Sequence, residues 1–151
     1  MITVLEYTKD RIDDVIKFEQ SLRLEEDFWG WEIDDTYIKS VKDSFDNPSF
    51  DDSISLLAYV DNKVVGRIDS TMIKSRFDGS TKAYLDWICV IKSYRHKGVA
   101  QALMNELLRR LKERRIDTLI GLTASNEEAK KFYQSIPNSI MRDIGIWIDV
   151  K

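Results

Sequence analysis

The sequence predicts one domain of the α/β or α+β class, in which helices flank a mixed sheet. Its 151 residues are the length of one ordinary domain, with no internal repeat, low-complexity tract or linker. Hydrophobic residues make up 43% and charged residues 32%, a composition typical of globular proteins. Stretches with alternating apolar residues and stretches with helical spacing follow the order β-α-α-β-β-β-α-β-α-β, which indicates a mixed fold.

The first third of the chain predicts a strand and two helices. Residues 2–7 form the strand, and residues 10–24 form the first helix, with Asp10 as its N-cap. A second helix covers residues 34–45 and ends before Pro48, because the residue preceding a proline disfavours helical backbone.

The middle of the chain predicts three strands joined by tight turns. Residues 53–60 and 63–73 pair as a hairpin around the Asp61-Asn62 turn. A second turn at residues 77–80 leads to a third strand over residues 82–91.

The last third predicts two further helices and the end of the sheet. Residues 97–114 form a helix with one apolar face at i+4 spacing, and residues 117–123 form a strand. Residues 126–134 form a helix that Ser125 or Asn126 can cap. The tail, around residues 140–150, is expected to form one or two strands.

Composition excludes several classes of function. The net charge of −3 and the pI of about 5.3 are unlike those of a general nucleic-acid binder, which is usually basic. The single cysteine, Cys89, rules out an intramolecular disulfide and a cysteine-based zinc site, and no metal is expected. The chain begins without a signal-peptide pattern, and no apolar run reaches the roughly 18 residues of a membrane span. We therefore expect a soluble cytoplasmic protein with no nucleic-acid or membrane partner.

A basic turn with a glycine, Arg95-His96-Lys97-Gly98-Val99-Ala100, joins a strand to an amphipathic helix. A helix N-terminus presents unpaired N–H groups and the positive end of the dipole, and a glycine lets an anion approach the backbone. The pattern favours a pyrophosphate site, the alternative being a helix that merely begins with a basic turn. It is not a Walker motif, which ends in Gly-Lys-Ser/Thr, nor the dinucleotide fingerprint, which needs a third glycine.

Two segments resemble a known family. Leu85-Asp86-Trp87-Ile88-Cys89-Val90, followed by the basic turn, resembles motif A of the GCN5-related N-acetyltransferases (GNAT). Asn126-Glu127-Glu128-Ala129-Lys130-Lys131-Phe132-Tyr133 resembles their motif B, in the family's order and separation. The resemblance implies the acyl-CoA N-acyltransferase fold over residues 1–151, with a mixed, mostly antiparallel sheet. After Tyr133 the chain departs from the family's usual Leu-Gly-Phe, which affects the last loop and the strand after it.

The resemblance also implies a site for acetyl-CoA as the donor. Backbone groups of residues 88–90 would pair with the pantetheine arm like an added strand. Backbone N–H groups of residues 96–101 would hold the pyrophosphate, and the Asn126 side chain would contact the cofactor. The implied cofactor-binding residues are Ile88, Cys89, Val90, Arg95, His96, Lys97, Gly98, Val99, Ala100, Gln101, Asn126, Ala129 and Tyr133.

Tyr133 and Asp86 are the candidate catalytic residues. Tyr133 would lie near the sulfur, where a phenol can protonate the departing thiolate; the alternative is a core aromatic residue. Asp86 is the candidate base, acting directly or through a water, and the alternative is a structural carboxylate. Simple alternation places Asp86 on one strand face with Ile88 and Val90, partly removed from water. The oxyanion would be held by a backbone N–H of Val90 or its neighbour.

Cys89 and His96 are the other side chains with catalytic chemistry. A covalent acetyl-cysteine is disfavoured, since the family's ternary transfer needs no cysteine and a lone buried cysteine is usually a small apolar residue. His96 lies in the basic turn, so a backbone or anion role is favoured over that of a base.

The segment at residues 25–32 combines carboxylates with indole rings where the family places its variable acceptor loop. Such groups bind cations through charge and cation–π contacts, so Glu26, Trp29 and Trp31 are candidate acceptor-binding residues. The alternative is that the tryptophans pack on the core. A polyamine, an aminoglycoside-like antibiotic or a basic peptide would fit. The basic run at residues 109–115 is expected to be a solvated helix face.

The sequence therefore predicts an N-acetyltransferase that moves the acetyl group of acetyl-CoA to a primary amine, on a small cationic acceptor, by direct attack in a ternary complex. Two alternatives stay open: an acetyltransferase acting on a protein or peptide N-terminus or lysine, and a non-catalytic acyl-CoA-binding regulatory module. The tail could also pair across a homodimer interface. The acceptor, the acyl-chain length and the oligomeric state stay open.

Overall fold

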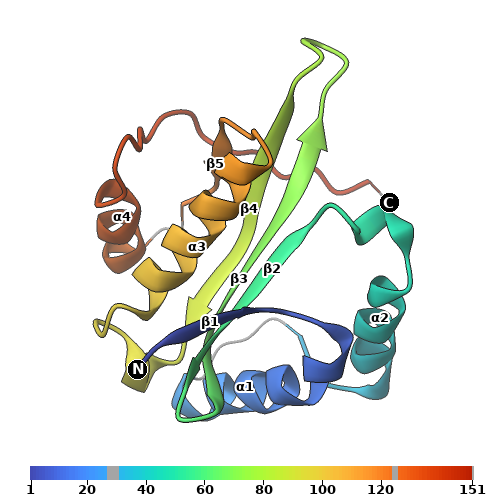
Figure 1. The fold of residues 1–151 in the computed structure, drawn as a ribbon, viewed down its shortest axis with the longest axis vertical. Helices are drawn as coiled ribbons and strands as arrows, with labels where there is room; N and C mark the ends of the chain where they lie inside the picture. Colours follow the sequence, from blue (N-terminus) through green and yellow to red (C-terminus); the bar gives the residue numbers. More distant parts are fainter. Residues whose placement is uncertain (27–30, 124–125, 151) are drawn as a thin grey trace. The chain divides into compact units, whose positions relative to one another are not determined.

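The computed structural model describes residues 1–26, 31–123 and 126–150. The chain divides into two compact units, Met1–Ile120 and Gly121–Lys151 (Figure 1). The first unit holds nearly all of the sheet and three α-helices, and the second holds the last α-helix and the tail. The assignment of residues 1–151 to a single domain stays a prediction.

The order of the described helices and strands confirms the predicted order up to the last helix. The strands and α-helices are β1 (Thr3–Glu6), α1 (Ile12–Glu25), α2 (Asp35–Phe45), β2 (Ile54–Val60), β3 (Lys63–Lys74), β4 (Thr81–Val90), α3 (Val99–Glu113), β5 (Leu119–Gly121) and α4 (Glu127–Gln134). Short 3-10 helices are η1 (Lys9–Arg11), η2 (Pro48–Phe50) and η3 (Lys92–Tyr94).

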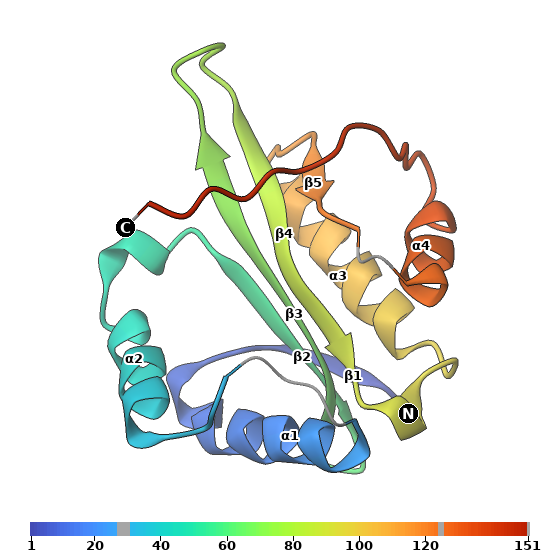
Figure 2. The same cartoon turned by 180° about the vertical axis from the view of Figure 1, so that it is seen from behind.

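The strands form one sheet in the order β1-β2-β3-β4-β5. Strands β1 to β4 are antiparallel neighbours, and β5 follows β4 through α3, the kind of connection that parallel neighbours require. Figures 1 and 2 show β3 and β4 as a long hairpin that extends beyond β1 and β2. The turn between β2 and β3 is as predicted: Asp61 (φ 48°) and Asn62 (φ 61°) are both left-handed, as a type I′ hairpin needs. The mixed, mostly antiparallel sheet is confirmed.

Apolar helix faces cover both sides of the sheet in the first unit. Helix α3 buries Val99 and Leu103, at 2% and 0% exposure, along its predicted apolar face. Gly66 of β3 allows this close contact, since a Cβ there would lie 2.8 Å from Cγ1 of Val99. On the other side, Phe18 of α1 packs in one cluster with Leu57 of β2.

Two predicted helix starts are wrong for local reasons. Asp10 does not cap the first helix, because it lies within η1, and α1 begins only at Ile12. The third helix starts at Val99 rather than residue 97, because Gly98 has a φ of 83°, outside the helical region.

The predicted strands at the end of the chain are shorter or missing. Strand β5 keeps only part of residues 117–123, and residues 140–150 form no strand. The tail still alternates, with Ile144, Ile146 and Ile148 at 95%, 81% and 75% exposure. Alternation alone does not make a strand, because a strand also needs a neighbour that supplies hydrogen-bond partners.

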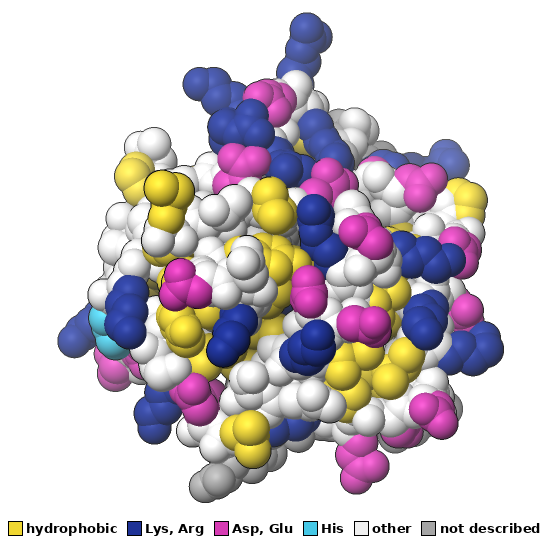
Figure 3. All heavy atoms as spheres, turned by 60° about the horizontal axis from the view of Figure 1, so that its bottom comes forward, with side chains coloured by type: hydrophobic (Ala, Val, Ile, Leu, Met, Phe, Trp, Pro, Cys, Tyr) yellow, Lys and Arg dark blue, Asp and Glu magenta, His cyan; other side chains and the backbone are white. Residues whose placement is uncertain are grey.

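Charge is interspersed on the face of the molecule shown in Figure 3, where basic and acidic side chains lie side by side. The basic run at residues 109–115 starts on the solvated side of α3, as predicted, where Arg109 and Arg110 pair with Glu106 at 2.8 and 2.9 Å. These bonds lower the pKa of Glu106 to about 2. Within the described ranges, every helix is too short or too polar to span a bilayer.

Candidate active site

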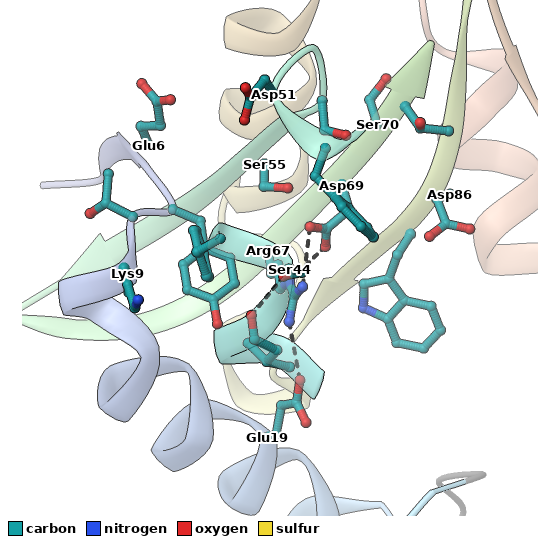
Figure 4. A pocket seen from close by; sticks show the side chains of 18 of the residues that line it. Glu6, Lys9, Glu19, Ser44, Asp51, Ser55, Arg67, Asp69, Ser70 and Asp86 are labelled. Atoms are coloured by element: carbon teal, nitrogen blue, oxygen red, sulfur yellow. Dashed lines mark hydrogen bonds and ion pairs between the residues drawn. The ribbon is translucent and has the colours of Figure 1, made fainter. Parts of the chain in front are cut away.

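A β-bulge interrupts the pairing of β3 with β4. Asp69 lies opposite Trp87, and the next residue of β3 lies opposite Leu85, so Asp86 is left without a partner across the ladder. A bulge adds one residue to a strand and re-aims the side chains around it. Asp86 and Trp87 consequently both line one pocket, together with Tyr84. Figure 4 shows Asp86 at this pocket.

The bulge overturns two expectations about Asp86. Simple alternation put it on one face with Ile88 and Val90, but neither of those residues lines the pocket among the described residues. Asp86 is also exposed rather than partly removed from water. Its carboxylate makes no hydrogen bond or ion pair with any described residue, so it is open to a ligand.

The pocket lies in the first unit, on the side of the sheet where α1 and α2 contribute side chains. Its volume is about 870 Å³, within the range of small-molecule sites, which is about 300–1,000 Å³. Its aromatic lining includes Tyr7, Trp31, Tyr37, Phe45, Tyr84 and Trp87. Its charged lining is mainly acidic, with Glu6, Glu19, Asp51, Asp69 and Asp86 against Lys9 and Arg67.

Arg67 lies at the centre of the pocket between two carboxylates (Figure 4). Its Nε and Nη2 donate to the two carboxylate oxygens of Asp69, at 2.6 and 3.1 Å, and its Nη1 donates to Oε1 of Glu19 at 3.1 Å. The centre of the Tyr7 ring is 4.9 Å from the guanidinium carbon. The side chains of Glu19, Asp69 and Arg67 are only 4%, 15% and 17% exposed, and buried charges of this kind need partners.

This network sets the protonation of Arg67 and Tyr37 at neutral pH. Burial acts to lower the pKa of Arg67, but the carboxylates of Asp69 and Glu19 outweigh it, and the pKa is raised overall. The Tyr37 hydroxyl donates to Glu19 at 2.6 Å, and burial together with this bond raises the pKa of Tyr37 to about 12. The guanidinium therefore stays charged and the phenol stays protonated.

Trp31 connects the wall of the pocket to this network. Its Nε1 donates to Oε2 of Glu19 at 3.3 Å, and its ring packs edge-on against Trp87 with 5.5 Å between centroids. The guanidinium of Arg23 lies 5.4 Å from the Trp31 ring. Trp31 was predicted to bind the acceptor, and it lines the pocket. Trp29, predicted with it, lies outside the described residues.

The end of α1 is tied to the start of the basic turn. Glu25 accepts bonds from the backbone N–H and the hydroxyl of Ser93, both at 2.8 Å, and these bonds lower the pKa of Glu25. Arg95 pairs with Glu26 at 2.7 Å, and its Nε donates to the Val90 carbonyl at 3.1 Å. Glu26, predicted to bind the acceptor, thus pairs with a residue predicted to bind the cofactor, and it is not part of the described pocket lining.

The turn itself has the conformation of an anion site. Gly98 is left-handed at φ 83°, and a Cβ there would meet no atom within 4 Å, so the backbone angle rather than crowding calls for glycine. His96 is left-handed as well, at φ 58°. The first N–H groups of α3, from Val99 to Gln101, have no i−4 carbonyl within the helix, and Gly98 has no side chain to cap them. An anion is a suitable partner for these groups.

Strand β4 presents the backbone predicted to pair with pantetheine. The Ala83 N–H donates to the carbonyl of Thr118 at 2.9 Å, just before β5, so β5 meets the first half of β4. Three residues of strand span about 10 Å, too short to follow β4 to Val90. Cys89, next to that end, is buried, and burial raises the pKa of its thiol to about 12. A protonated thiol is a poor nucleophile, which argues against an acetyl-cysteine.

The second unit carries the residues of motif B. Asn126 caps α4, as predicted: its Oδ1 accepts the Ala129 N–H at 2.8 Å. Tyr133, in the last turn of α4, is half-buried, with its ring 5.5 Å from that of Phe132. Burial raises the pKa of the Tyr133 phenol, which keeps it protonated, as a proton donor must be.

The sequence did not single out Glu19, Tyr37, Arg67 or Asp69. A signal existed for some of them. Glu19 occupies a position on the apolar face of α1 beside Phe18, where a charge needs a partner. Arg67 and Asp69 lie two residues apart on β3, with the apolar Ile68 between them, so alternation puts both on one face of the sheet.

Comparison with known proteins adds to this geometry. A family model described as the acetyltransferase (GNAT) family matches residues 12–136. No curated protein sequence gives a significant match.

Several solved structures are similar in fold. An aminoglycoside acetyltransferase from an uncultured soil metagenomic sample, in complex with sisomicin, is 13% identical, with a TM-score of 0.82 over 99% of this chain and 97% of its own. AAC(6')-Iy, in complex with the bisubstrate analogue CoA-S-monomethyl-acetylneamine, is 17% identical, with a TM-score of 0.78 over 100% and 99%. A ribosomal-protein-alanine N-acetyltransferase from Brucella melitensis biovar Abortus 2308 is 19% identical, with a TM-score of 0.75 over 100% and 99%.

Proposed function

Because the chain belongs to the GNAT family of acetyltransferases, we propose that it transfers the acetyl group of acetyl-CoA to a primary amine on a small cationic acceptor. The observation that carries the acceptor class is the pocket at the β-bulge, where the open carboxylate of Asp86 lies beside the indoles of Trp31 and Trp87. Carboxylates and indole faces attract ammonium groups.

The basic turn and the end of β4 support the donor half of this proposal. The N–H groups at the start of α3, behind the left-handed Gly98, suit a pyrophosphate. Residues 88–90 lie where β5 is too short to pair with β4, which suits an added strand such as the pantetheine arm. AAC(6')-Iy, which binds a CoA-containing bisubstrate analogue, has a similar fold.

The proposed chemistry needs three groups. The amine must attack the thioester carbon as the neutral base, and Asp86 would accept its proton directly or through a water. A backbone N–H of Val90 or a neighbour would hold the oxyanion. The C–S bond then breaks, and Tyr133 would give its proton to the thiolate that leaves.

A peptide or protein amine is the second candidate acceptor, since a ribosomal-protein acetyltransferase shares the fold. The pocket favours the small cation, because its volume is that of a small-molecule site. A cytoplasmic location and a homodimer are further parts of the proposal.

An acceptor screen with a tyrosine variant tests this function. Release of CoA thiol from acetyl-CoA is measured with polyamines, aminoglycosides and a basic peptide. We expect turnover with the small cations, and a Tyr133→Phe variant with kcat lowered about 10²- to 10⁴-fold, the usual contribution of a general acid. Its Kd for acetyl-CoA should stay near that of the wild type. Since burial raises the pKa of Tyr133, the alkaline fall of activity that depends on this phenol should lie above pH ~10.

Tyr59→Phe is the matched control. The Tyr59 hydroxyl bonds to Asp14 at 3.0 Å, and Tyr59 does not line the pocket, so its loss should leave kcat nearly unchanged. An unchanged kcat in Tyr133→Phe would sink the assignment of the proton donor. Tight acetyl-CoA binding without turnover on any amine would instead favour the non-catalytic module.

A further inference from the structure

Both cationic side chains among the described residues of the pocket are already paired. All three guanidinium nitrogens of Arg67 donate hydrogen bonds to the carboxylates of Asp69 and Glu19. Lys9 holds Asp46, outside the pocket lining, at 2.6 Å. An incoming anion would therefore have to displace an existing carboxylate partner.

The pocket's anionic side is arranged differently. Asp86 has no partner among the described residues and is exposed. Asp69 and Asp86 lie on neighbouring strands, since Asp69 is opposite Trp87, which follows Asp86. Arg23, which does not line the pocket, also pairs with Glu19, with 3.8 Å between its Nη1 and Oε2 of Glu19. The carboxylates of Glu19 and Asp69 are thus neutralised by arginines, and that of Asp86 remains as open negative charge.

We propose that Arg67, held by Glu19 and Asp69, makes this pocket select amines that carry no carboxylate. The inference rests on the proposed function and names its acceptor class: diamines, polyamines and amino sugars rather than amino acids. Arg67 is a specificity-determining residue in this scheme. Because its guanidinium is already paired with Glu19 and Asp69, it is not available to bind a carboxylate on the acceptor.

The physical reason lies in desolvation and like charge. A carboxylate on the acceptor would enter beside the carboxylates of Asp69 and Asp86, and the described lining offers no unpaired cation to receive it. Specificity of this kind comes from repelling the wrong ligand as well as from attracting the right one. The repulsion between the acceptor carboxylate and the pocket carboxylates weakens as the salt concentration rises if it acts through solvent. It persists in salt where the charges are partly buried.

Matched pairs of amines test the proposal on the wild-type protein. Cadaverine and lysine differ by one carboxylate, as do histamine and histidine, and tyramine and tyrosine. We expect kcat/KM, in every pair that turns over, to favour the member without the carboxylate by about 100-fold or more. Equal kcat/KM for the two members of the pairs would overturn the inference.

Two isosteric variants test the role of Arg67. Asp69→Asn and Glu19→Gln each remove one negative charge that is paired with the Arg67 guanidinium, which leaves the guanidinium more available to a ligand carboxylate. The ratio of kcat/KM for cadaverine to kcat/KM for lysine should therefore fall about tenfold. Asp52→Asn is the control, since Asp52 pairs with Lys74 at 2.6 Å and does not line the pocket; its selectivity should equal that of the wild type. Unchanged selectivity in both pocket variants would contradict the role of Arg67. If one variant fails to fold, the other carries the test.

Binding measured without acetyl-CoA separates this inference from the proposed function. Trp31 and Trp87 line the pocket, so acceptor binding should change tryptophan fluorescence. Selective binding of cadaverine over lysine, without turnover of any amine, would keep the inference and reject the proposed reaction. Turnover of amines without this selectivity would keep the reaction and reject the inference.

Discussion

The basic turn and the acceptor pocket lie in the same unit but are built in opposite ways. The proposed donor site is made of backbone: its features are the left-handed Gly98 and the first N–H groups of α3, all within a few consecutive residues. The proposed acceptor site is made of side chains that the fold brings together, such as Glu19 and Arg67, which are 48 residues apart. The proposed donor site is therefore encoded locally, and the proposed acceptor site by long-range contacts.

This difference predicts which property a substitution in each region should change. A change at the turn should alter donor affinity and little else, because few tertiary contacts depend on a backbone site. A change in the pocket network should alter folding and acceptor choice together, because the same bonds do both. Three substitutions, taken in order of expected effect, test the contrast.

Arg67→Met should have the largest effect on stability. It leaves the buried carboxylates of Glu19 and Asp69 without their shared partner, and breaking a buried pair in this way costs about 3–5 kcal/mol. That is a large part of the roughly 5–15 kcal/mol that stabilises a domain. Urea unfolding followed by far-UV circular dichroism measures the loss.

Arg109→Met provides the matched control. Arg109 pairs with Glu106 as Arg67 pairs with Asp69, but its side chain is 54% exposed, and an exposed pair contributes little to stability because solvent screens it. Equal losses of stability in the two variants would show that the pocket network is no more than a surface ion pair.

Gly98→Ala should affect the donor site selectively. An alanine at φ 83° costs about 1–2 kcal/mol, and any shift of the backbone moves the N–H groups that we propose hold the pyrophosphate. We expect the Kd for acetyl-CoA to rise about tenfold, which corresponds to about 1.4 kcal/mol, while the preference among acceptors stays that of the wild type. Isothermal titration with acetyl-CoA measures the first, and the paired-amine assay the second.

Gly79→Ala is the control that separates the effect of backbone strain from an effect on acetyl-CoA binding. Gly79, in the turn between β3 and β4, has a φ of 69° and open space around it, so the alanine carries a similar backbone cost far from the basic turn. Its Kd for acetyl-CoA should be unchanged. A tenfold loss in both variants would mean that strain alone, rather than the phosphate site, weakens binding.

The contrast between local patterns and long-range contacts also explains which features could be predicted from the sequence. The strands, the helices and the basic turn follow from patterns within ten or fifteen neighbouring residues. The face of Asp86 does not, because the bulge is set by the pairing with Asp69 across β3 and β4. The partners of Glu26 and Glu19 likewise depend on which elements meet in space. The tail shows the converse, since its local alternation was clear and residues 140–150 form no strand.

Ser70, which lines the pocket beside Asp69, is the site of the substitution expected to have the smallest effect. It follows Asp69 on β3 and is 3% exposed, yet its hydroxyl has no hydrogen-bond partner among the described residues. Its neighbours across the sheet are Ile54 and Leu85, both buried. An unpaired buried hydroxyl costs free energy, so Ser70→Ala should leave stability unchanged or raise it by up to about 1 kcal/mol.

Ser93→Ala should shift stability in the opposite direction. The Ser93 hydroxyl donates to Glu25 at 2.8 Å, and losing this exposed bond should lower stability slightly. Measured side by side, the urea midpoint of Ser93→Ala should lie below that of the wild type, and that of Ser70→Ala at or above it. A loss above about 1 kcal/mol in Ser70→Ala would mean that its hydroxyl is hydrogen-bonded in solution, for instance to water in the pocket that it lines.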